Sequence, residues 1–474
     1  SLPDNPTALV VTDGAGQSKW TVTIPHNASF PLRAEQYADI CRQGEDARSK
    51  LIKGSRFGRL AEAHWKPSYY SRDWTFLDVA DAEQSGALPI VSEGLAENVC
   101  SRSLTFVMDT EDAGFGKTLL LLWLSYGLAK KEGRAFFVDD TNWPYGNYSS
   151  YFAPPPVQRC PPPPRHEILP CPHQTRHLVV SAATAPWTFG ALFERAFMRH
   201  DRDGADQHKD IYALLHKGYK ALFELRGDDA LYARDRAAQL RKAALQNHGA
   251  VVSMHIRRGD LHPHEYQYTR DYLPLERYAV GAQSLFRFLL YPDSVSGDSL
   301  DFSANPRYQH SPLLLASDDP DIVSSTELSQ AIAPWSLLRA QERIQLASKS
   351  ALDQVAPVQP IRQQGSAYVK HVDENSGWEG GFYPDLFYSI GKPRKKLRNG
   401  ELALADGSGP VTDQAMRMRE FIGRAYLLDL AVLSKSDGVV CAVSSATCRL
   451  LGVMMGWEAV RDGKWVNVDD GRGW

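Results

Sequence analysis

The stretch SLTFVMDTEDAGFGKTLLLLWLSYGLAKKEGRAFFVD occupies residues 103–139 and indicates the fold class. Its mostly apolar start, residues 103–108, predicts a short buried strand. A turn that contains two glycines follows, and an apolar helix is predicted over residues 118–129. Basic residues and Gly133 end this helix, and residues 134–139 predict a second buried strand. Strand, glycine turn, helix and strand form a βαβ unit, so we expect a parallel sheet.

A second α/β block begins near residue 250. Its predicted strands are residues 251–256, 313–316 and 438–443. Helical patterns lie between them, at residues 272–290 and 416–433. We therefore expect two α/β domains, an N-terminal domain of residues 1–249 and a C-terminal domain of residues 250–474.

The remaining segments connect or extend these two blocks. Residues 33–53 have helical spacing, whereas residues 4–29 resemble a loop or an edge strand. Prolines dominate residues 154–164, which must form a connecting loop. Residues 191–246 are again helical in pattern. Residues 356–412 are rich in Gly, Pro and charge, and we expect a long loop or lid there.

Composition excludes several classes of protein. The chain has 474 residues, 43% of them hydrophobic, and a formal net charge of −3, so it lacks the basic excess of proteins that bind nucleic acid backbones. No stretch reaches the ~20 apolar residues that span a bilayer. We expect no nucleic acid partner.

Six cysteines are present, an even number, and none forms a CxxC pair, which makes a zinc site improbable. They are Cys41, Cys100, Cys160, Cys171, Cys441 and Cys448. Two N-glycosylation sequons begin at Asn27 and Asn147. Together these features favour an oxidising, secretory compartment.

The segment His255–Asp260, HIRRGD, carries the main chemical signal. Its two arginines follow a buried strand, at the edge where open α/β sheets bind ligands. The planar fork of arginine suits a phosphate, and two arginines suit a pyrophosphate. The same letters also fit an ordinary Arg–Asp surface turn.

Further segments resemble, in the same order, motifs of the α1,6-fucosyltransferases, the family of animal core fucosyltransferases and bacterial Nod-factor enzymes. They are the glycine loop Gly114–Gly116, the Asn-Trp-x-Tyr element Asn142–Tyr145, the Arg-Arg-x-Asp motif with Glu265 after it, the strand LLLASDDP at Leu313–Pro320, Asp429, and the Cys-x-x-Ser-Ser-x-x-Cys-Arg segment Cys441–Arg449. The resemblance runs from about Cys100 to the C-terminus.

This resemblance implies a GT-B fold, in which two Rossmann-like α/β domains enclose a cleft. It also implies the donor site. Arg257, with Arg258, would bind the β-phosphate of GDP-fucose, assisted by loop amides around Gly114 and Gly116 and by Ser445.

Other donor contacts follow from the same family pattern. The main chain near His255 and the carboxylate of Asp429 would bind guanine, and Tyr145 would line the ribose. Asp260 would hold the arginines in place. Asp318, Asp319 and Ser444 complete the implied donor site.

The implied reaction is an inverting transfer of fucose to a glycan hydroxyl, O6 of an acceptor such as N-acetylglucosamine. Glu265 would be the general base that takes the proton of this hydroxyl, with His264 as the alternative base. No metal or cofactor is implied, because arginine would neutralise the departing GDP.

The family bridges the two cysteines of its Ser-Ser segment, which implies a Cys441–Cys448 disulfide. Cys100–Cys160 is the next expected bridge, and it leaves Cys41 with Cys171. The resemblance also implies the Golgi lumen. We expect a membrane anchor in the full-length protein, through a segment that these residues do not include.

Other interpretations of these residues remain open. Lys117 and Thr118 end the glycine loop like a P-loop, but Glu111 stands where that motif needs glycine. Asp318 to Asp321 could be the acidic metal motif of GT-A transferases, or Asp318 could cap the next helix. His255, His262 and His264 could bind a metal, although they lack the i, i+4 spacing.

Departures from the family leave the activity open as well. Leu261 stands where animal enzymes have lysine, Ala446 replaces a glutamine, and the SH3-like domain is not among these residues. The alternatives are a protein O-fucosyltransferase, a transferase for another GDP-sugar, and an inactive sugar-binding homologue.

Overall fold

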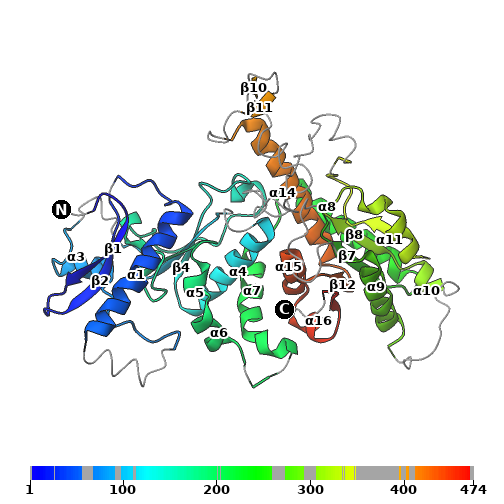
Figure 1. Ribbon diagram of the computed structural model, residues 1–474. Coiled ribbons are helices and arrows are strands. Elements are labelled where there is room, and N and C mark those ends of the chain that lie inside the picture. The colour runs from blue at the N-terminus through cyan, green and yellow to red at the C-terminus, as the bar shows by residue number, and fades with distance from the viewer. Residues whose placement is uncertain are drawn as a thin grey trace, which may run out of the picture. The chain divides into compact units, whose positions relative to one another are not determined.

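The structure is a computed structural model (Figure 1). It describes residues 3–25, 27–55, 68–90, 98–109, 114–199, 201–202, 204–258, 273–292, 306–333, 335, 337–345, 347–348, 394–396, 402–404 and 411–469. The chain packs into two compact units that alternate along the sequence. Unit 1 comprises Ser1–Asp112, Leu121–Trp143 and Pro154–Leu222, and unit 2 comprises Ala113–Leu120, Pro144–Ala153 and Phe223–Trp474. The predicted domain boundary at residues 249 and 250 stays a prediction.

Unit 1 is built on a parallel sheet in the order β4–β3–β6–β5. Its strands are β3 (Ser103–Val107), β4 (Ala135–Asp139), β5 (Ile168–Leu169) and β6 (His177–Val180). The predicted strands are confirmed as β3 and β4, with helix α4 (Phe115–Lys131) between them in the sequence. Every residue of β3 and β6 is buried, as expected for central strands of a parallel sheet.

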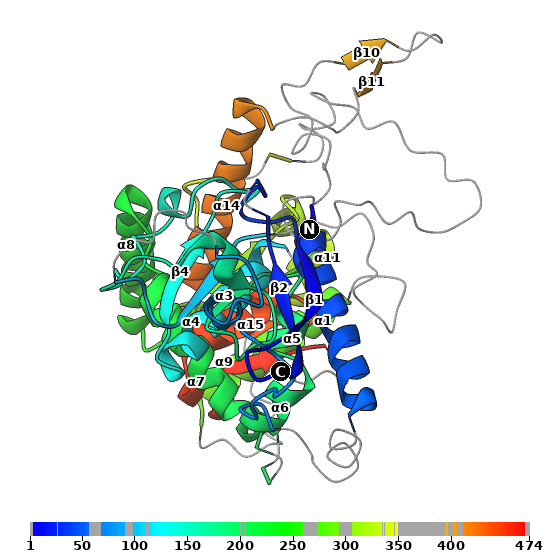
Figure 2. The ribbon, with the colours of Figure 1, turned by 90° about the vertical axis from the view of Figure 1, so that its left-hand side faces the viewer.

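An antiparallel hairpin of β1 (Thr7–Thr12) and β2 (Ser18–Thr23) packs against α1 (Ala34–Gly54) at the N-terminal end of unit 1 (Figure 2). The predicted helix at residues 33–53 is thereby confirmed. The remaining helices of unit 1 are α3 (Val79–Gln84), α5 (Ala185–Thr188), α6 (Ala191–Phe197) and α7 (Lys209–Leu222), with 3-10 turns η2 (Arg165–Glu167) and η3 (Gly204–His208). The proline-rich segment, residues 154–164, contains no helix or strand, as predicted.

Helices α4 and α7 cross in direct backbone contact within unit 1. A Cβ added at Gly127 would lie 2.2 Å from the carbonyl oxygen of Leu214, and one at Gly218 would lie 2.1 Å from that of Trp123. Each helix therefore places a glycine against the main chain of the other. This reciprocal contact lets the two helices approach more closely than side chains would allow.

Unit 2 contains a second parallel sheet, in the order β13–β12–β7–β8–β9. Its strands are β7 (Val252–Ile256), β8 (Leu313–Ser317), β9 (Leu337–Arg339), β12 (Gly438–Cys441) and β13 (Trp465–Asn467). The three strands predicted for the second block are confirmed as β7, β8 and β12. With parallel sheets in both units, the mixed α/β class is confirmed.

Helices of unit 2 complete the predicted alternation of strands and helices. They are α8 (Gly227–Leu245), α9 (Leu275–Leu290), α10 (Pro306–Gln309), α11 (Thr326–Ala331), α14 (Asp413–Leu433), α15 (Ala446–Met455) and α16 (Trp457–Arg461), with turns η1 (Tyr148–Ser150) and η5 (Ile322–Ser324). A short hairpin, β10 (Arg394–Lys396) and β11 (Leu402–Leu404), lies within the predicted lid. Apart from this hairpin and residues 411–412, the predicted lid lies outside the described residues.

The side chains of β7 point alternately to the two faces of the second sheet. Val252, Met254 and Ile256 pack with α9 in one buried apolar cluster. Because side chains alternate along a strand, His255 faces the opposite side of the sheet. Cys441, which pairs with His255 in the β7–β12 register, is bonded on that side to Cys448 of α15.

The structure contains three disulfides. They are Cys41–Cys171, Cys100–Cys160 and Cys441–Cys448, with Cα–Cα distances of 5.7, 5.0 and 5.4 Å. All three predicted pairs are confirmed, and they fit a protein that folds in a secretory or extracellular environment. Among the described residues, no helix is long and apolar enough to cross a membrane.

We predict that Gly127→Ala destabilises the protein by about 1–3 kcal/mol, because the added methyl group must push α4 and α7 apart. The matched control is Gly54→Ala in α1, where an added Cβ meets no atom within 4 Å, and where alanine should be neutral or stabilising. Thermal unfolding of both variants provides the measurement. Equal melting temperatures for the two variants would contradict the close contact.

Candidate functional site

In the second sheet, the order in which successive strands are added reverses between β7 and β12. Along the chain, β7 is followed outward by β8 and β9, and the chain then returns to place β12 and β13 on the other side of β7. Ligands of open α/β sheets bind at such a switch point, beyond the carboxyl ends of the strands. The loops after β7 and β12 are therefore where a ligand of unit 2 is expected.

The predicted arginines lie directly at this point, in the loop after β7. Arg257 and Arg258 are both partly exposed. The backbone amide of Arg258 donates to Oδ1 of Asp318 over 2.7 Å, and its guanidinium lies 3.9 Å from the carboxylate of Glu327. The loop after β7 is thus fixed by a residue that follows the neighbouring strand β8.

Asp318 and Asp319 shape the ends of both strands. Asp318 is buried and its carboxylate accepts from the loop after β7. The caps of the next helical segments, η5 and α11, are Asp321 and Ser325, not Asp318. Oδ1 of Asp319 accepts from the amide of Asp321 over 3.0 Å, and its own amide donates to Oγ of Ser317. Both aspartates thus form hydrogen bonds with protein groups among the described residues, and these bonds tighten the turn after β8.

The serine pair follows β12 and begins helix α15. Oγ of Ser445 accepts from the amide of Thr447 over 3.3 Å and caps the helix. The amide of Ser444 donates to Oδ2 of Asp469 over 3.1 Å, and no described group hydrogen-bonds to the Ser444 hydroxyl. The Cys441–Cys448 disulfide joins the end of β12 to the first turn of α15. It therefore restrains the loop that presents both serines.

The predicted glycine loop lies against the start of α15. A Cβ at Gly116 would be 2.7 Å from Oη of Tyr426 and 3.2 Å from Cβ of Ala446. The carbonyl of Gly114 accepts from the amide of Thr118 over 2.9 Å, which makes Gly114 the N-cap residue of α4. The N-termini of α4 and α15 are thus brought together, and helix N-termini favour anions.

Tyr145 lies in an aromatic cluster behind the glycine loop. Its ring is fully buried and meets Phe115 edge-on, with 4.5 Å between ring centroids. Its carbonyl accepts from the Tyr151 hydroxyl over 2.6 Å, and Phe115 also packs on Tyr426. Phe115 of the glycine loop therefore contacts both the Tyr145 ring and Tyr426 of α14. Its contact with a ribose stays a prediction.

Asp429 of α14 lines a small cavity at the carboxyl end of β8, together with Asp319, Arg339 and Gln341. Burial raises the pKa of Asp429 well above its ordinary value, although Arg339 and a hydrogen bond from Gln341 act in the opposite direction. The cavity holds only about 30 Å³, whereas pockets for small ligands hold ~300–1,000 Å³. A purine can bind beside Asp429 only if lining side chains move.

His255 is buried at the end of β7. Burial, with Arg257 nearby, lowers its pKa to about 3, so the imidazole is neutral at pH 7. No described group hydrogen-bonds to its Nδ1. A neutral ring beside Arg257 adds no positive charge of its own to the loop after β7.

Several predicted residues lie outside the described residues. They are Asp260, Glu265, Leu261, His262 and His264. Their roles, including the general base, stay predictions.

Three residues that the sequence did not single out belong to this site. Arg339 is the last residue of the short strand β9, Gln341 comes two residues after it, and both approach Asp429. Asp469 follows β13 and fixes Ser444. Each lies at or just after the carboxyl end of a strand of the same parallel sheet, which is the only signal that could have suggested them.

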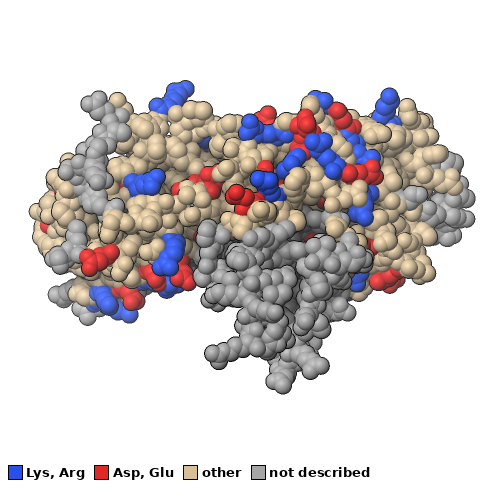
Figure 3. All heavy atoms as spheres, turned by 90° about the horizontal axis from the view of Figure 1, so that it is seen from above, with Lys and Arg blue, Asp and Glu red and all other residues tan. Residues whose placement is uncertain are grey.

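Charged side chains of both signs are interspersed on the face shown in Figure 3. The described residues of that face form no broad surface of a single sign. Binding to a nucleic acid backbone requires an extended basic surface, which this face does not offer.

The chain is similar to several solved structures, one of them a fucosyltransferase. No protein-family model matches the chain, and no curated protein matches it. The fucosyltransferase is NodZ alpha-1,6-fucosyltransferase, from a crystal soaked with GDP-fucose; it is 11% identical, covers 74% of this chain and 92% of its own, and has a TM-score of 0.32. A TM-score this low does not establish a common fold. The family stays a resemblance that the motifs carry.

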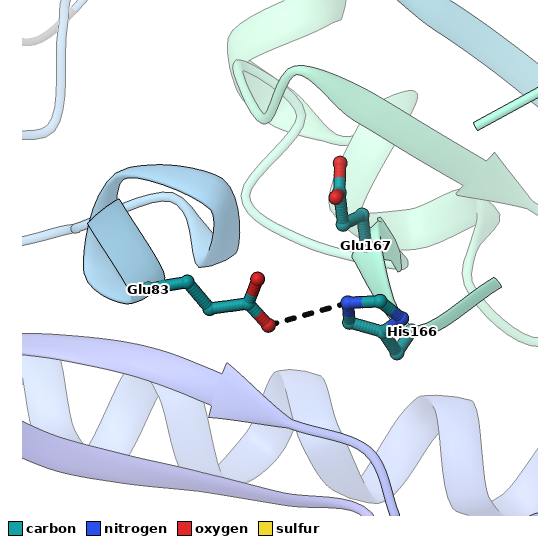
Figure 4. Close-up of side chains that lie close together, drawn as sticks. All are labelled: Glu83, His166 and Glu167. Carbon is teal, nitrogen blue, oxygen red and sulfur yellow. Dashed lines mark ion pairs between the residues drawn. The ribbon is translucent and has the colours of Figure 1, made fainter. Parts of the chain in front are cut away.

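A separate cluster of metal-ligating residue types lies in unit 1. Ligand atoms of Glu83, His166 and Glu167 all lie within 4.8 Å of one another. Figure 4 shows the Glu83 carboxylate directed at the His166 ring, and this ion pair measures 3.2 Å. Glu167 in turn lies 3.7 Å from Nε2 of His177. The contacts form a network of polar side chains that joins α3 to the sheet, and they account for the cluster without a metal ion.

Two groups of this network have displaced pKa values. Burial, assisted by the charges of Glu83 and Asp78, raises the pKa of Glu167 to about 6. Burial lowers the pKa of His177 to about 4, and Nδ1 of this ring is 2.9 Å from the Ser103 hydroxyl. The folded protein therefore disfavours protonated His177. Its contribution to stability is complete above pH ~6.5 and is lost as the pH falls towards 4.

We predict that His177→Gln reduces the acid sensitivity of the fold. Between pH 7 and pH 4 the histidine should cost up to about 3 kcal/mol of unfolding free energy, at ~1.36 kcal/mol per pKa unit, and glutamine does not titrate. Denaturant unfolding at both pH values measures this difference, with exposed His310→Gln as the control. The same pH dependence in His177→Gln and wild type would contradict the assignment.

Proposed function

We propose that the chain is a glycosyltransferase that moves fucose from GDP-fucose to a glycan hydroxyl with inversion at C1. The observation that carries this proposal is the position of two adjacent arginines, Arg257 and Arg258, at the strand switch of the second sheet. Beside them begins α15, with Ser444 and Ser445 at its N-terminus. Cations, amides and hydroxyls at one sheet edge suit the diphosphate of a nucleotide sugar.

We propose that Arg257 binds the β-phosphate of the donor, with Arg258 as a second cation. The amides at Gly114 and Gly116 and the hydroxyl of Ser445 would complete the phosphate contacts. Support comes from the close approach of Gly116 to Ala446, which brings two helix N-termini together. We further propose that these groups neutralise the leaving GDP in a reaction that uses no metal and no cofactor.

We propose that Asp429 recognises guanine, because one carboxylate can accept from both N1–H and N2–H of that base. The main chain near His255 would contribute to the same recognition, and Tyr145 would support the ribose side of the site. The raised pKa of Asp429 reflects a half-buried carboxyl group whose burial outweighs the effects of Arg339 and Gln341. The two guanine donors would compensate the charge of this carboxylate.

In the proposed transfer step, Glu265 takes the proton of the acceptor hydroxyl. The oxygen of this hydroxyl forms a bond to C1 of fucose, while the bond from C1 to the β-phosphate oxygen breaks and GDP leaves with the electron pair. Asp260 would hold the arginines in place for the departing diphosphate. Attack from the face opposite GDP inverts the configuration at C1.

The wider setting is part of the same proposal. We propose a GT-B arrangement of the two α/β domains and a glycan acceptor such as N-acetylglucosamine, modified at O6. We also propose the Golgi lumen as the location, with a membrane anchor in the full-length protein. The three disulfides support an oxidising compartment.

Calorimetric titration with GDP in EDTA, with UDP and ATP as controls, tests the donor site. We expect GDP-selective binding that Arg257→Ala weakens at least ~10-fold, since charge-assisted phosphate contacts are strong. Exposed Arg417→Ala should bind like wild type. Glu265→Gln should bind GDP normally and lose transfer from GDP-fucose. Preference for UDP or ATP would overturn the donor assignment, and normal turnover by Glu265→Gln would overturn the general base.

The raised pKa of Asp429 predicts a pH-dependent affinity for GDP. Guanine binds the carboxylate form, so affinity should rise with pH until the pH exceeds the pKa of the free protein, and binding below that pKa should release a proton. Titrations in buffers of different ionisation enthalpy measure the released proton. Asp429→Asn should bind at least ~10-fold more weakly and should release no proton there. Equal proton release by both proteins would exclude Asp429 as the titrating group.

A further inference from the structure

Three arginines precede three neighbouring strands of the first sheet. Arg102 stands directly before β3, Arg134 before β4 and Arg176 before β6. Ser103 pairs with both Ala135 and His177 in the parallel register. The three arginines therefore lie side by side at the edge of the sheet where its strands begin.

Arg134 is the structural member of this row. It is buried, and its guanidinium donates to the carbonyls of Ser103, Thr175 and His173 over 2.8–3.2 Å. Its Nε donates to the carboxylate of Glu132 over 2.6 Å. These contacts tie together the starts of the strands and occupy the Glu132 carboxylate.

A cavity of about 480 Å³ lies at this edge. It is lined by Tyr70, Arg72, Arg102, Lys131, Glu132, Arg134, His173 and Gln174. Glu132 is the sole carboxylate among these residues, and Arg134 already pairs with it. The cavity therefore presents several cations with little acidic compensation.

Among the residues that the structure describes, no carboxylate forms an ion pair with the exposed cations of this cavity, Arg72, Arg102 and Lys131. Arg72 forms no ion pair with a described residue, and the hydrogen bond of Arg102 is a 3.5 Å contact to the Glu132 carbonyl. Burial and the charge of Arg134 lower the pKa of Arg102. Lys131 is exposed and lies over the ring of Phe197. An anionic ligand would relieve this crowding of like charges.

A second cavity of about 270 Å³ shares Arg72, Arg102 and Gln174 with the first and adds Lys19 and Arg176. Its acids are engaged with protein groups. Asp81 pairs with Arg176 at 2.8 Å, Asp73 pairs with Arg48 at 3.3 Å, and Asp78 accepts from the amide of Arg176 at 2.8 Å. Lys19 and Arg176 are likewise paired, with Asp13 and Asp81, so the cations that the two cavities share are Arg72 and Arg102. The two cavities together offer room for more than one sugar ring beside these arginines.

We propose that this edge of the first sheet binds an acidic saccharide, through sulfate or carboxylate groups held by Arg72, Arg102 and Lys131. The Tyr70 ring, 55% exposed, offers a flat apolar surface on which a sugar ring can stack. The preference for an anion rests on these residues alone. The choice of a saccharide as its carrier rests on the proposed transferase function, for which the bound sugar would be part of the acceptor.

Calorimetry at ~150 mM salt tests the proposal with four probes: a heparin-derived tetrasaccharide, a hyaluronan tetrasaccharide, chitotetraose and inorganic sulfate. We expect one or both acidic tetrasaccharides to bind and chitotetraose to bind far more weakly. Arg72→Gln/Arg102→Gln should weaken acidic tetrasaccharide binding by about 10- to 100-fold. The matched control, Arg195→Gln/Lys217→Gln, removes two exposed cations elsewhere in unit 1 and should leave binding unchanged.

Three results would overturn the proposal: no binding of either acidic tetrasaccharide, an equal loss in the control variant, or inorganic sulfate binding as tightly as the tetrasaccharides. Tyr70→Ala should weaken tetrasaccharide binding and leave sulfate binding unchanged, and an unchanged tetrasaccharide affinity would remove the stacking role. GDP titration of the same variants keeps the two proposals apart. Absent tetrasaccharide binding in wild type with GDP binding intact counts against this edge alone, whereas absent GDP binding in wild type counts against the donor site.

Discussion

The parallel pairing of β12 with β7 is the contact on which the candidate donor site depends. It places the loop with Arg257 and Arg258 beside the loop with Ser444 and Ser445, although nearly two hundred residues separate them in the sequence. The Cys441–Cys448 disulfide and Asp469 then fix the serine loop, and Asp318 fixes the arginine loop. Each loop is held by a residue that follows another strand of the same sheet, so the geometry of the site follows from the register of the sheet.

Two charged residues, Arg134 at the amino edge of the first sheet and Asp429 near the carboxyl edge of the second, differ in how their neighbours compensate their charge. Arg134 is buried and stable because carbonyl groups and Glu132 satisfy its guanidinium. Asp429 is half-buried, and burial raises its pKa although Arg339 and Gln341 act in the opposite direction. A satisfied buried charge serves the fold, whereas a poorly satisfied one is a candidate for ligand contact.

Local signals were sufficient for much of the fold. The βαβ unit at residues 103–139 and the strands β7, β8 and β12 are long and apolar enough to be predicted from the sequence alone. Strands β9 and β13 have only three residues each and carry no periodicity that distinguishes them from loops. The motif residues were found by resemblance, but the partners of Asp429 and Ser444 come from distant segments. No local pattern specifies such pairs, and only the sheet topology brings them together.

The interleaving of the two units bears on how the chain acquires its structure during synthesis. Unit 1 is complete once Leu222 has been made, and early domains generally fold first. The segments Ala113–Leu120 and Pro144–Ala153 emerge with it but pack on α14, which is made far later; there Phe115 and Tyr151 both come within 3.0 Å of a Cβ built at Gly423. Their apolar rings must therefore remain without their final partners while some two hundred further residues are added. The nascent chain thus carries a temporary apolar surface. We expect chaperones to bind this surface until the C-terminal half has been synthesised.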